Sequence, residues 1–178
     1  MNLKLLCFLA LLALLLLGPN AKAASDKADS VFLAGLHARI AGIRGWTEQK
    51  DRFRYFQTRL LYDIIDGGAV EYEKTGLVDG IVVDLGADSN RTVEIYIENF
   101  GRPAHARTML AQKKKSANEP KQLDAPAVAD AFYDEVIGGC MVYFCRDNYY
   151  FEMTLTGYDN PQQGMRDGKI FVNLCLKK

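Results

Sequence analysis

The sequence predicts an α+β fold, in which an antiparallel sheet of about five strands carries helices packed on one face. Two pairs of β-rich segments lead to this prediction, because turn residues join the segments of each pair and one side of each segment is apolar. Segments with apolar residues at helical spacing precede both pairs, and a last alternating segment ends the chain.

The first 23 residues have the layout of a secretory signal peptide. Lys4 gives a positive start, residues 5–17 are an almost unbroken apolar run, and Ala21-Lys22-Ala23 is a small-x-small cleavage site. The run is short for a membrane span of about 20 residues. We therefore predict export to the periplasm or the extracellular space, with a single mature domain of residues 24–178 and no membrane span after cleavage.

Two helices are predicted next. Leu36, Ile40 and Ile43 recur at intervals of three and four, which places them on one side of a helix. A second helix is predicted over residues 57–74, and it contains Gly67-Gly68. Each glycine inside a helix costs about 1 kcal/mol relative to alanine. We interpret the pair either as a point of close helix–sheet packing or as a helix break that contacts a ligand.

A β-hairpin is predicted over residues 78–100. Ile81-Val82-Val83 is a β-branched run, turn residues follow it, and the next segment places Val93, Ile95 and Ile97 on one face. The opposite face of that segment carries Thr92, Glu94, Tyr96 and Glu98. Pro103 then begins a helix that ends in a run of lysines.

A further helix, a second hairpin and a last strand complete the predicted order, over residues 126–136, 140–156 and 170–176. If Asp147-Asn148 forms a two-residue loop, three apolar pairs face each other across the hairpin. These pairs are Phe144 with Phe151, Val142 with Met153, and Cys140 with Leu155. All six side chains then share one face, which favours this register.

Three of the four cysteines lie in the predicted mature chain. Export permits disulfides, and an odd number leaves at least one thiol without an intramolecular partner. Cys145 and Cys175 are both expected to point away from the apolar face, on neighbouring strands. A Cys145–Cys175 disulfide is therefore our hypothesis, and it would stabilise the fold by about 3–4 kcal/mol. No C-x-x-C pair occurs, so no metal site is predicted.

The charge balance and the motif content of the sequence exclude several classes of function. The chain has 22 basic and 22 acidic side chains, and two of the lysines fall in the predicted signal peptide. This balance gives no electrostatic basis for binding nucleic acid. The sequence has no nucleophile elbow, zinc-protease or nucleotide-binding motif. No catalytic residue and no cofactor is predicted.

The leading hypothesis is a non-enzymatic domain that binds a protein or a small ligand of the cell envelope near the Gly-Gly helix. The candidate ligand-binding residues are Tyr62, Asp66, Gly67, Gly68, Glu94 and Tyr96. One alternative is a hydrolase that uses the carboxylates of Asp63, Asp66 and Glu94, because paired carboxylates in a cleft can perform acid–base chemistry. Another alternative is a structural component of the envelope.

Two segments resemble a family of bacterial exported proteins of unknown function. They are Leu61-Tyr62-Asp63-Ile64-Ile65-Asp66-Gly67-Gly68-Ala69 and Thr92-Val93-Glu94-Ile95-Tyr96. Members of that family carry a "LYEYINGGAELY"-like helix and a "VTVEIYDM"-like strand, followed by a helix near "GSPEDAF". The resemblance covers residues 46–112 and resumes at Tyr149-Tyr150-Phe151. Asp66 replaces the family's Asn, and Val70 replaces its Glu. The resemblance implies a fold and an exported location more than an activity.

Overall fold

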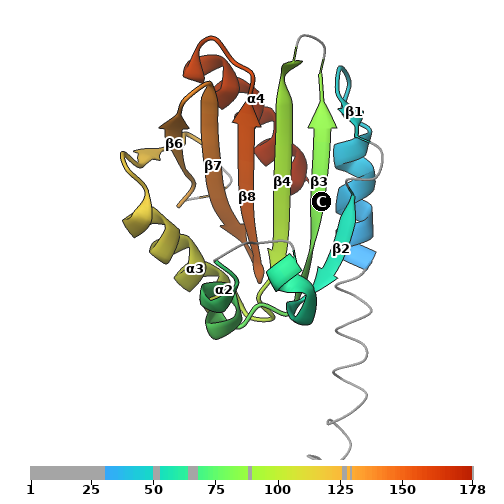
Figure 1. Cartoon of the computed structure of the whole chain (residues 1–178), viewed down its shortest axis with the longest axis vertical. Coiled ribbons are helices and arrows are strands. Elements are labelled where there is room, and N and C mark those ends of the chain that lie inside the picture. Colours follow the sequence, from blue (N-terminus) through green and yellow to red (C-terminus); the bar gives the residue numbers. More distant parts are fainter. Residues whose placement is uncertain are drawn as a thin grey trace, which may run out of the picture. The chain divides into compact units, whose positions relative to one another are not determined.

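The computed structural model describes residues 31–49, 53–63, 68–87, 90–125, 128 and 130–177 (Figure 1). The chain divides into two compact units, Met1–Gly35 and Leu36–Lys178. Residues 31–35 of the first unit are helical, and so are residues 36–41 of the second unit. The predicted signal peptide lies outside the described residues. Among the helices that are described, none is long and apolar enough to cross a membrane.

An antiparallel sheet of eight strands forms the centre of the second unit. The strands are β1 (Thr47–Glu48), β2 (Arg54–Gln57), β3 (Asp79–Gly86), β4 (Thr92–Asn99), β5 (Lys121–Gln122), β6 (Phe132–Val136), β7 (Gly139–Arg146) and β8 (Tyr149–Thr156). Their order is β1-β3-β4-β8-β7-β6-β5, and β2 also pairs with β3. The predicted α+β class is confirmed, but the sheet is larger than predicted. Strands as short as β1 and β5 are too brief to show an alternating pattern.

Both predicted hairpins form, and they meet at the centre of the sheet where β4 pairs with β8. The predicted register of the second hairpin is confirmed for all three apolar pairs. Phe144 and Phe151 stack with their ring centroids 4.3 Å apart and are fully buried. Both hairpins therefore bury the face that their apolar alternation indicated.

The predicted last strand is wrong, because residues 170–176 belong to the helix α4 (Pro161–Leu176). Asn160 caps this helix by accepting a hydrogen bond from the backbone N–H of Gln162, and Pro161 follows at its first turn. The buried residues of α4 are Gly164, Gly168, Phe171, Val172 and Cys175, which have helical spacing. Gly164 and Gly168 make the first half of α4 resemble a loop in its composition. They lie against the sheet, where a Cβ on Gly164 would be 3.1 Å from the Sγ atom of Cys140.

The predicted helix over residues 126–136 is also wrong in its second half. Phe132–Val136 form β6, which pairs with β7 through a tight turn at Ile137 and Gly138. Gly138 has a φ of +74°, a backbone conformation that glycine adopts without strain. Pairing with β7 therefore overrides the helical spacing of apolar residues in this segment.

Helices cover both faces of the sheet rather than one, as Figure 1 shows with α2 and α3 in front of the sheet and α4 behind it. We call one side the α4 face; it carries Val93, Ile95, Ile97, Cys140, Val142, Phe144, Phe151, Met153 and Leu155. The other side, the α3 face, carries Val82, Glu94, Tyr96, Glu98, Tyr143, Cys145, Tyr150 and Glu152. The helix α3 (Pro103–Ser116) buries Ala106, Met109 and Leu110 against this second face. The α3 face therefore carries apolar side chains of its own, and α3 shields them from water.

The Cys145–Cys175 disulfide hypothesis is contradicted. Cys140, Cys145 and Cys175 are all free thiols. Cys145 lies on the α3 face and its Sγ donates to the carbonyl oxygen of Ala106 at 3.1 Å, whereas Cys175 is buried on α4. The sheet therefore separates the two thiols. The hypothesis failed because it placed Cys175 on a strand.

We expect Cys140, Cys145 and Cys175 all to be free thiols in the mature protein, so none of them should need reduction before it can be detected. In the folded protein at pH 8, Cys140 and Cys175 should not react with Ellman's reagent, because burial raises the pKa of each thiol to about 12. In denaturant all three should react, and prior reduction should not change the count. Recovery of a single thiol from unreduced, unfolded protein would reveal a disulfide.

Candidate functional site

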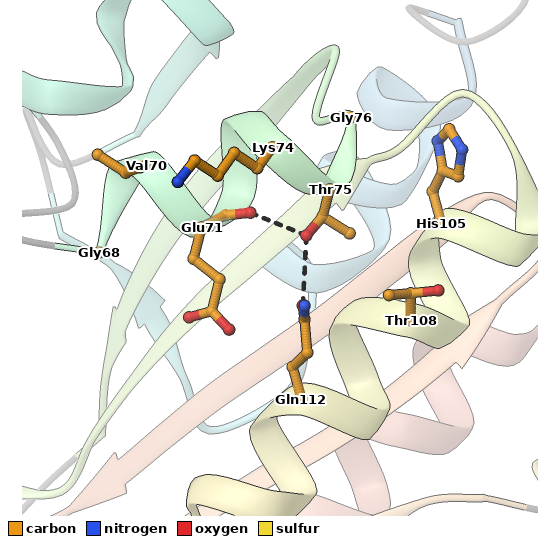
Figure 2. Close-up of a pocket in the computed structure, with 9 residues that line it drawn as sticks. All are labelled: Gly68, Val70, Glu71, Lys74, Thr75, Gly76, His105, Thr108 and Gln112. Carbon is orange, nitrogen blue, oxygen red and sulfur yellow. Dashed lines mark hydrogen bonds between the residues drawn. The ribbon is translucent and has the colours of Figure 1, made fainter.

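A pocket of about 630 Å³ lies between α2 (Ala69–Thr75) and α3 (Figure 2). It is lined by Gly68, Val70, Glu71, Lys74, Thr75, Gly76, His105, Thr108 and Gln112. Six of these side chains can form hydrogen bonds or carry charge. The pocket therefore presents a polar surface supplied by two helices that are separate in the sequence.

The short helix α2 is held in place by what it buries and by how it ends. Ala69 and Tyr72 are buried against the α3 face, so Glu71 and Lys74 project outward. Gly76 ends the helix with a φ of +97°, which favours glycine. A Cβ on Gly76 would lie only 2.7 Å from the Nδ1 atom of His105. The turn after α2 is therefore in close contact with α3.

Thr75 joins the two helices across the pocket. Its hydroxyl is 2.8 Å from the carbonyl oxygen of Glu71 and 3.2 Å from the side-chain oxygen Oε1 of Gln112. Figure 2 shows these contacts and the side chains around them. The contact with Gln112 fixes α2 relative to α3 and therefore helps to set the width of the pocket.

Three titratable side chains in the pocket remain available for a ligand. Glu71, Lys74 and His105 make no side-chain hydrogen bond or ion pair with any other residue of the described ranges. One carboxylate, one ammonium and one imidazole therefore line the same opening. Such a set can bind a ligand that carries both an acidic and a basic group.

Gly68 is the residue of the predicted Gly-Gly pair that the structure describes, and it lies in this pocket. Gly68 lines it and precedes α2 with φ −91° and ψ −14°, a conformation open to any residue. Tyr62, on the 3-10 helix η1 (Thr58–Asp63), is exposed, and its hydroxyl donates to Glu73 Oε2 at 3.0 Å. Asp66 and Gly67 lie outside the described residues.

Glu94 and Tyr96 lie on β4, away from the residues that line the α2–α3 pocket. Glu94 borders a smaller pocket of about 230 Å³ together with Asp84. The Tyr96 hydroxyl donates to Glu94 Oε1 at 3.3 Å, and burial, followed by the charge of Glu94, raises the pKa of Tyr96 above its ordinary value. The structure therefore does not unite the described candidates, Tyr62, Gly68, Glu94 and Tyr96, into one site.

Two carboxylates of the hydrolase alternative, Asp63 and Glu94, are described, and they do not line a common pocket. Asp63 is exposed on η1 and does not line the small pocket that Glu94 borders. In the part of the chain that is described, no group of three or more His, Cys, Asp or Glu side chains could hold a metal ion. The described geometry thus offers no pair of these carboxylates in a common cleft.

Sequence reasoning missed the residues that α3 contributes to the pocket. His105, Thr108 and Gln112 follow one another at intervals of three and four, which places them on one side of the helix. This polar side was a recognisable signal, but only the fold shows that it lies beside α2 rather than in open solvent.

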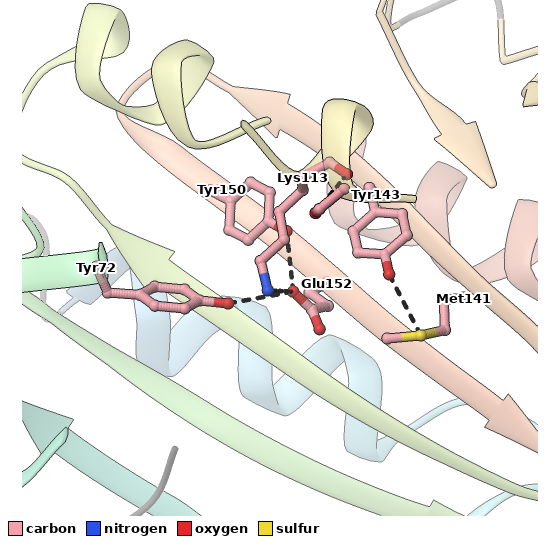
Figure 3. A network of polar contacts seen from close by, with 7 residues as sticks. Tyr72, Lys113, Met141, Tyr143, Tyr150 and Glu152 are labelled. Atoms are coloured by element: carbon pink, nitrogen blue, oxygen red, sulfur yellow. Dashed lines mark hydrogen bonds and ion pairs between the residues drawn. The ribbon is translucent and has the colours of Figure 1, made fainter. Parts of the chain in front are cut away.

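A network of polar contacts lies beneath α2 and α3 (Figure 3). The hydroxyls of Tyr72 and Tyr150 donate to Glu152 Oε2 at 3.3 and 2.9 Å. Lys113 Nζ lies 3.4 Å from the same oxygen atom. Glu152 on β8 therefore binds one residue of α2 and one of α3, and it holds both helices to the sheet.

The fold and the pocket define an α+β domain with a candidate binding site between two helices. No family model matches the chain, and no curated protein matches it. Among solved structures, the chain is similar to the extracellular domain of PknH from Mycobacterium tuberculosis. The identity is 13%, the TM-score is 0.48, and the match covers 83% of this chain and 95% of that chain. This likeness is too distant to assign a function.

Proposed function

We propose that the protein is an exported, non-enzymatic domain that binds a small zwitterionic ligand in the α2–α3 pocket. The observation that carries the proposal is the presence of Glu71, Lys74 and His105 in one open pocket without partners in the described chain. The acidic group of a ligand would pair with Lys74 and its basic group with Glu71. Thr108 and Gln112 would supply hydrogen bonds.

The expected affinity is modest. Glu71 and Lys74 are solvent-exposed, and exposed ion pairs contribute about 0–1 kcal/mol each. Modest affinity suits a domain that samples a ligand in the cell envelope. The proposed location rests on the signal-peptide layout of the first 23 residues. A purely structural role would require no pocket, so the α2–α3 pocket favours binding over the structural alternative.

We expect free amino acids to perturb the backbone amides of the pocket in ¹⁵N-labelled mature protein. Glutamate, lysine and glycine are suitable probes, with acetate and methylamine as ligands of a single charge. Titration should shift the amides of Thr75, His105 and Thr108, and Lys74→Glu should weaken the response about tenfold because it replaces an attraction with a repulsion.

Lys115→Glu is the matched control, since Lys115 is an exposed lysine in the last turn of α3 that does not line the pocket. It should bind the probes as the parent protein does. The proposal fails if none of the probes shifts the pocket amides, or if Lys74→Glu binds them with unchanged affinity.

A further inference from the structure

Glu98 is a buried carboxylic acid that the proposed binding site does not use. It lies on β4 with an exposed fraction of 0%, and neither carboxyl oxygen has a hydrogen-bond partner within the described part of the chain. An ionised carboxylate without partners is far more costly to bury than a neutral one. Burial, followed by the charge of Glu152, raises the pKa of Glu98 well above its ordinary value. Burial without partners therefore favours the protonated form of Glu98 in the folded domain.

The groups around Glu98 come from both helices and from the sheet. They are Tyr96 on β4, Tyr150 and Glu152 on β8, Tyr72 on α2 and Lys113 on α3. The residue of β3 that pairs with Glu98 is Gly80, which has no titratable group. Lys113 could stabilise an ionised Glu98, but its ammonium group already pairs with Glu152. The site therefore has no cation dedicated to Glu98.

Part of the cover over Glu98 comes from the helices that form the α2–α3 pocket, and Phe56 of β2 lies beside it against Gly80. Tyr72 reaches inward from α2 to Glu152, while Glu71 on the same helix faces the pocket. Lys113 reaches inward from α3, and the neighbouring Gln112 lines the pocket. A movement of α2 or α3 that admits water to Glu98 would therefore change the pocket as well.

We propose that Glu98 is a proton-dependent switch for α2 and α3. With its proton bound, both helices lie closed on the sheet and the pocket keeps its shape; loss of the proton admits water and releases the helices from the sheet. The consequence for ligand binding rests on the proposed function, whereas the opening of the helices does not.

The direction of the pH dependence follows from proton linkage. An opened form exposes Glu98 to water, where a glutamate has a pKa of about 4.3. Above that pH the closed form keeps a proton that the opened form has lost, so rising pH favours opening. One proton corresponds to a tenfold change in the opening equilibrium per pH unit, up to the raised pKa of the closed form.

Hydrogen exchange of the ligand-free mature protein between pH 5 and 7 tests this proposal. We expect the protection factors of α2 and α3, corrected for intrinsic exchange, to fall about tenfold per pH unit. In Glu98→Gln, which retains the shape but cannot ionise, protection should not change with pH. The matched control is Glu94→Gln, on the same strand and face but only partly buried, which should keep the parent slope.

A pH-independent protection in the parent, or an unchanged slope in Glu98→Gln, would overturn the proposal. If Glu98→Gln does not fold, the ¹³C resonance of the Glu98 carboxyl group in the parent decides the matter. It should remain that of a protonated acid at pH 6, and an ionised Glu98 at that pH excludes the switch. Because no ligand is present, failure here is distinguishable from failure of the proposed binding function.

Discussion

Replacing Gly139 with alanine is expected to lower the free energy of unfolding by about 3 kcal/mol or more. Gly139 begins β7 and pairs with Val136 on one side and Thr156 on the other. A Cβ at this position would overlap the carbonyl oxygen of Leu155 and lie 3.1 Å from the Cα atom of Thr156. Both neighbours are backbone atoms of β8, so the strand itself would have to move.

Gly138→Ala is the matched control, since it adds the same methyl group one residue earlier. No atom lies within 4 Å of a Cβ built on Gly138, so the expected cost is only that of its positive φ, about 1–2 kcal/mol. Urea unfolding of the two variants measures the difference. Equal destabilisation would show that close contact with β8 does not explain the glycine at position 139.

Truncation of Phe144 or Phe151 to alanine is expected to cost about 3–5 kcal/mol each. Both rings are fully buried and lie nearly parallel, with an interplanar angle of 6°. Each alanine would leave a cavity in the α4 face that the remaining ring cannot fill. The aromatic contact itself is expected to add about 0.5–1.5 kcal/mol of coupling.

A double-mutant cycle measures that coupling. Leucine replaces phenylalanine in the cycle, because two alanines would remove most of the 5–15 kcal/mol that is typical of a domain. Ile137→Ala serves as the reference for a surface change, since Ile137 is fully exposed and should shift stability by less than about 0.5 kcal/mol. Strictly additive Phe144 and Phe151 variants would contradict an energetic contact between the rings.

Local patterns predicted the hairpins correctly because the information they need is short-range. A two-residue loop at Asp147-Asn148 and alternating apolar residues allow one register that buries a single face. The same logic failed for residues 170–176, where alternating apolar residues occur in a helix. Its residue Ile170 is 52% exposed, while the buried Phe171 and Val172 are adjacent in sequence, as helical packing allows.

The sequence predicted only part of the candidate site, because the residues that line the pocket come from segments that are far apart in the sequence. The sequence directed attention to the Gly-Gly segment, and Gly68 does line the α2–α3 pocket. Glu94 lies on the same face of β4 as Glu98, yet Glu94 is only partly buried whereas Glu98 is fully buried. Alternation gives the face on which a side chain lies, but not whether a later helix will cover it.

The sequence by itself determined the α+β class, the two hairpins, the register of the second and the helix that begins at Pro103. These features depend on residues a few positions apart, whose spacing fixes which side chains share a face. Only the tertiary structure decided that both faces of the sheet are covered, that Cys145 and Cys175 are separated, and that Glu98 is buried on the face that α2 and α3 cover. Those outcomes depend on which distant segments pack together, because burial and charge environment belong to the assembled layers and not to any one segment.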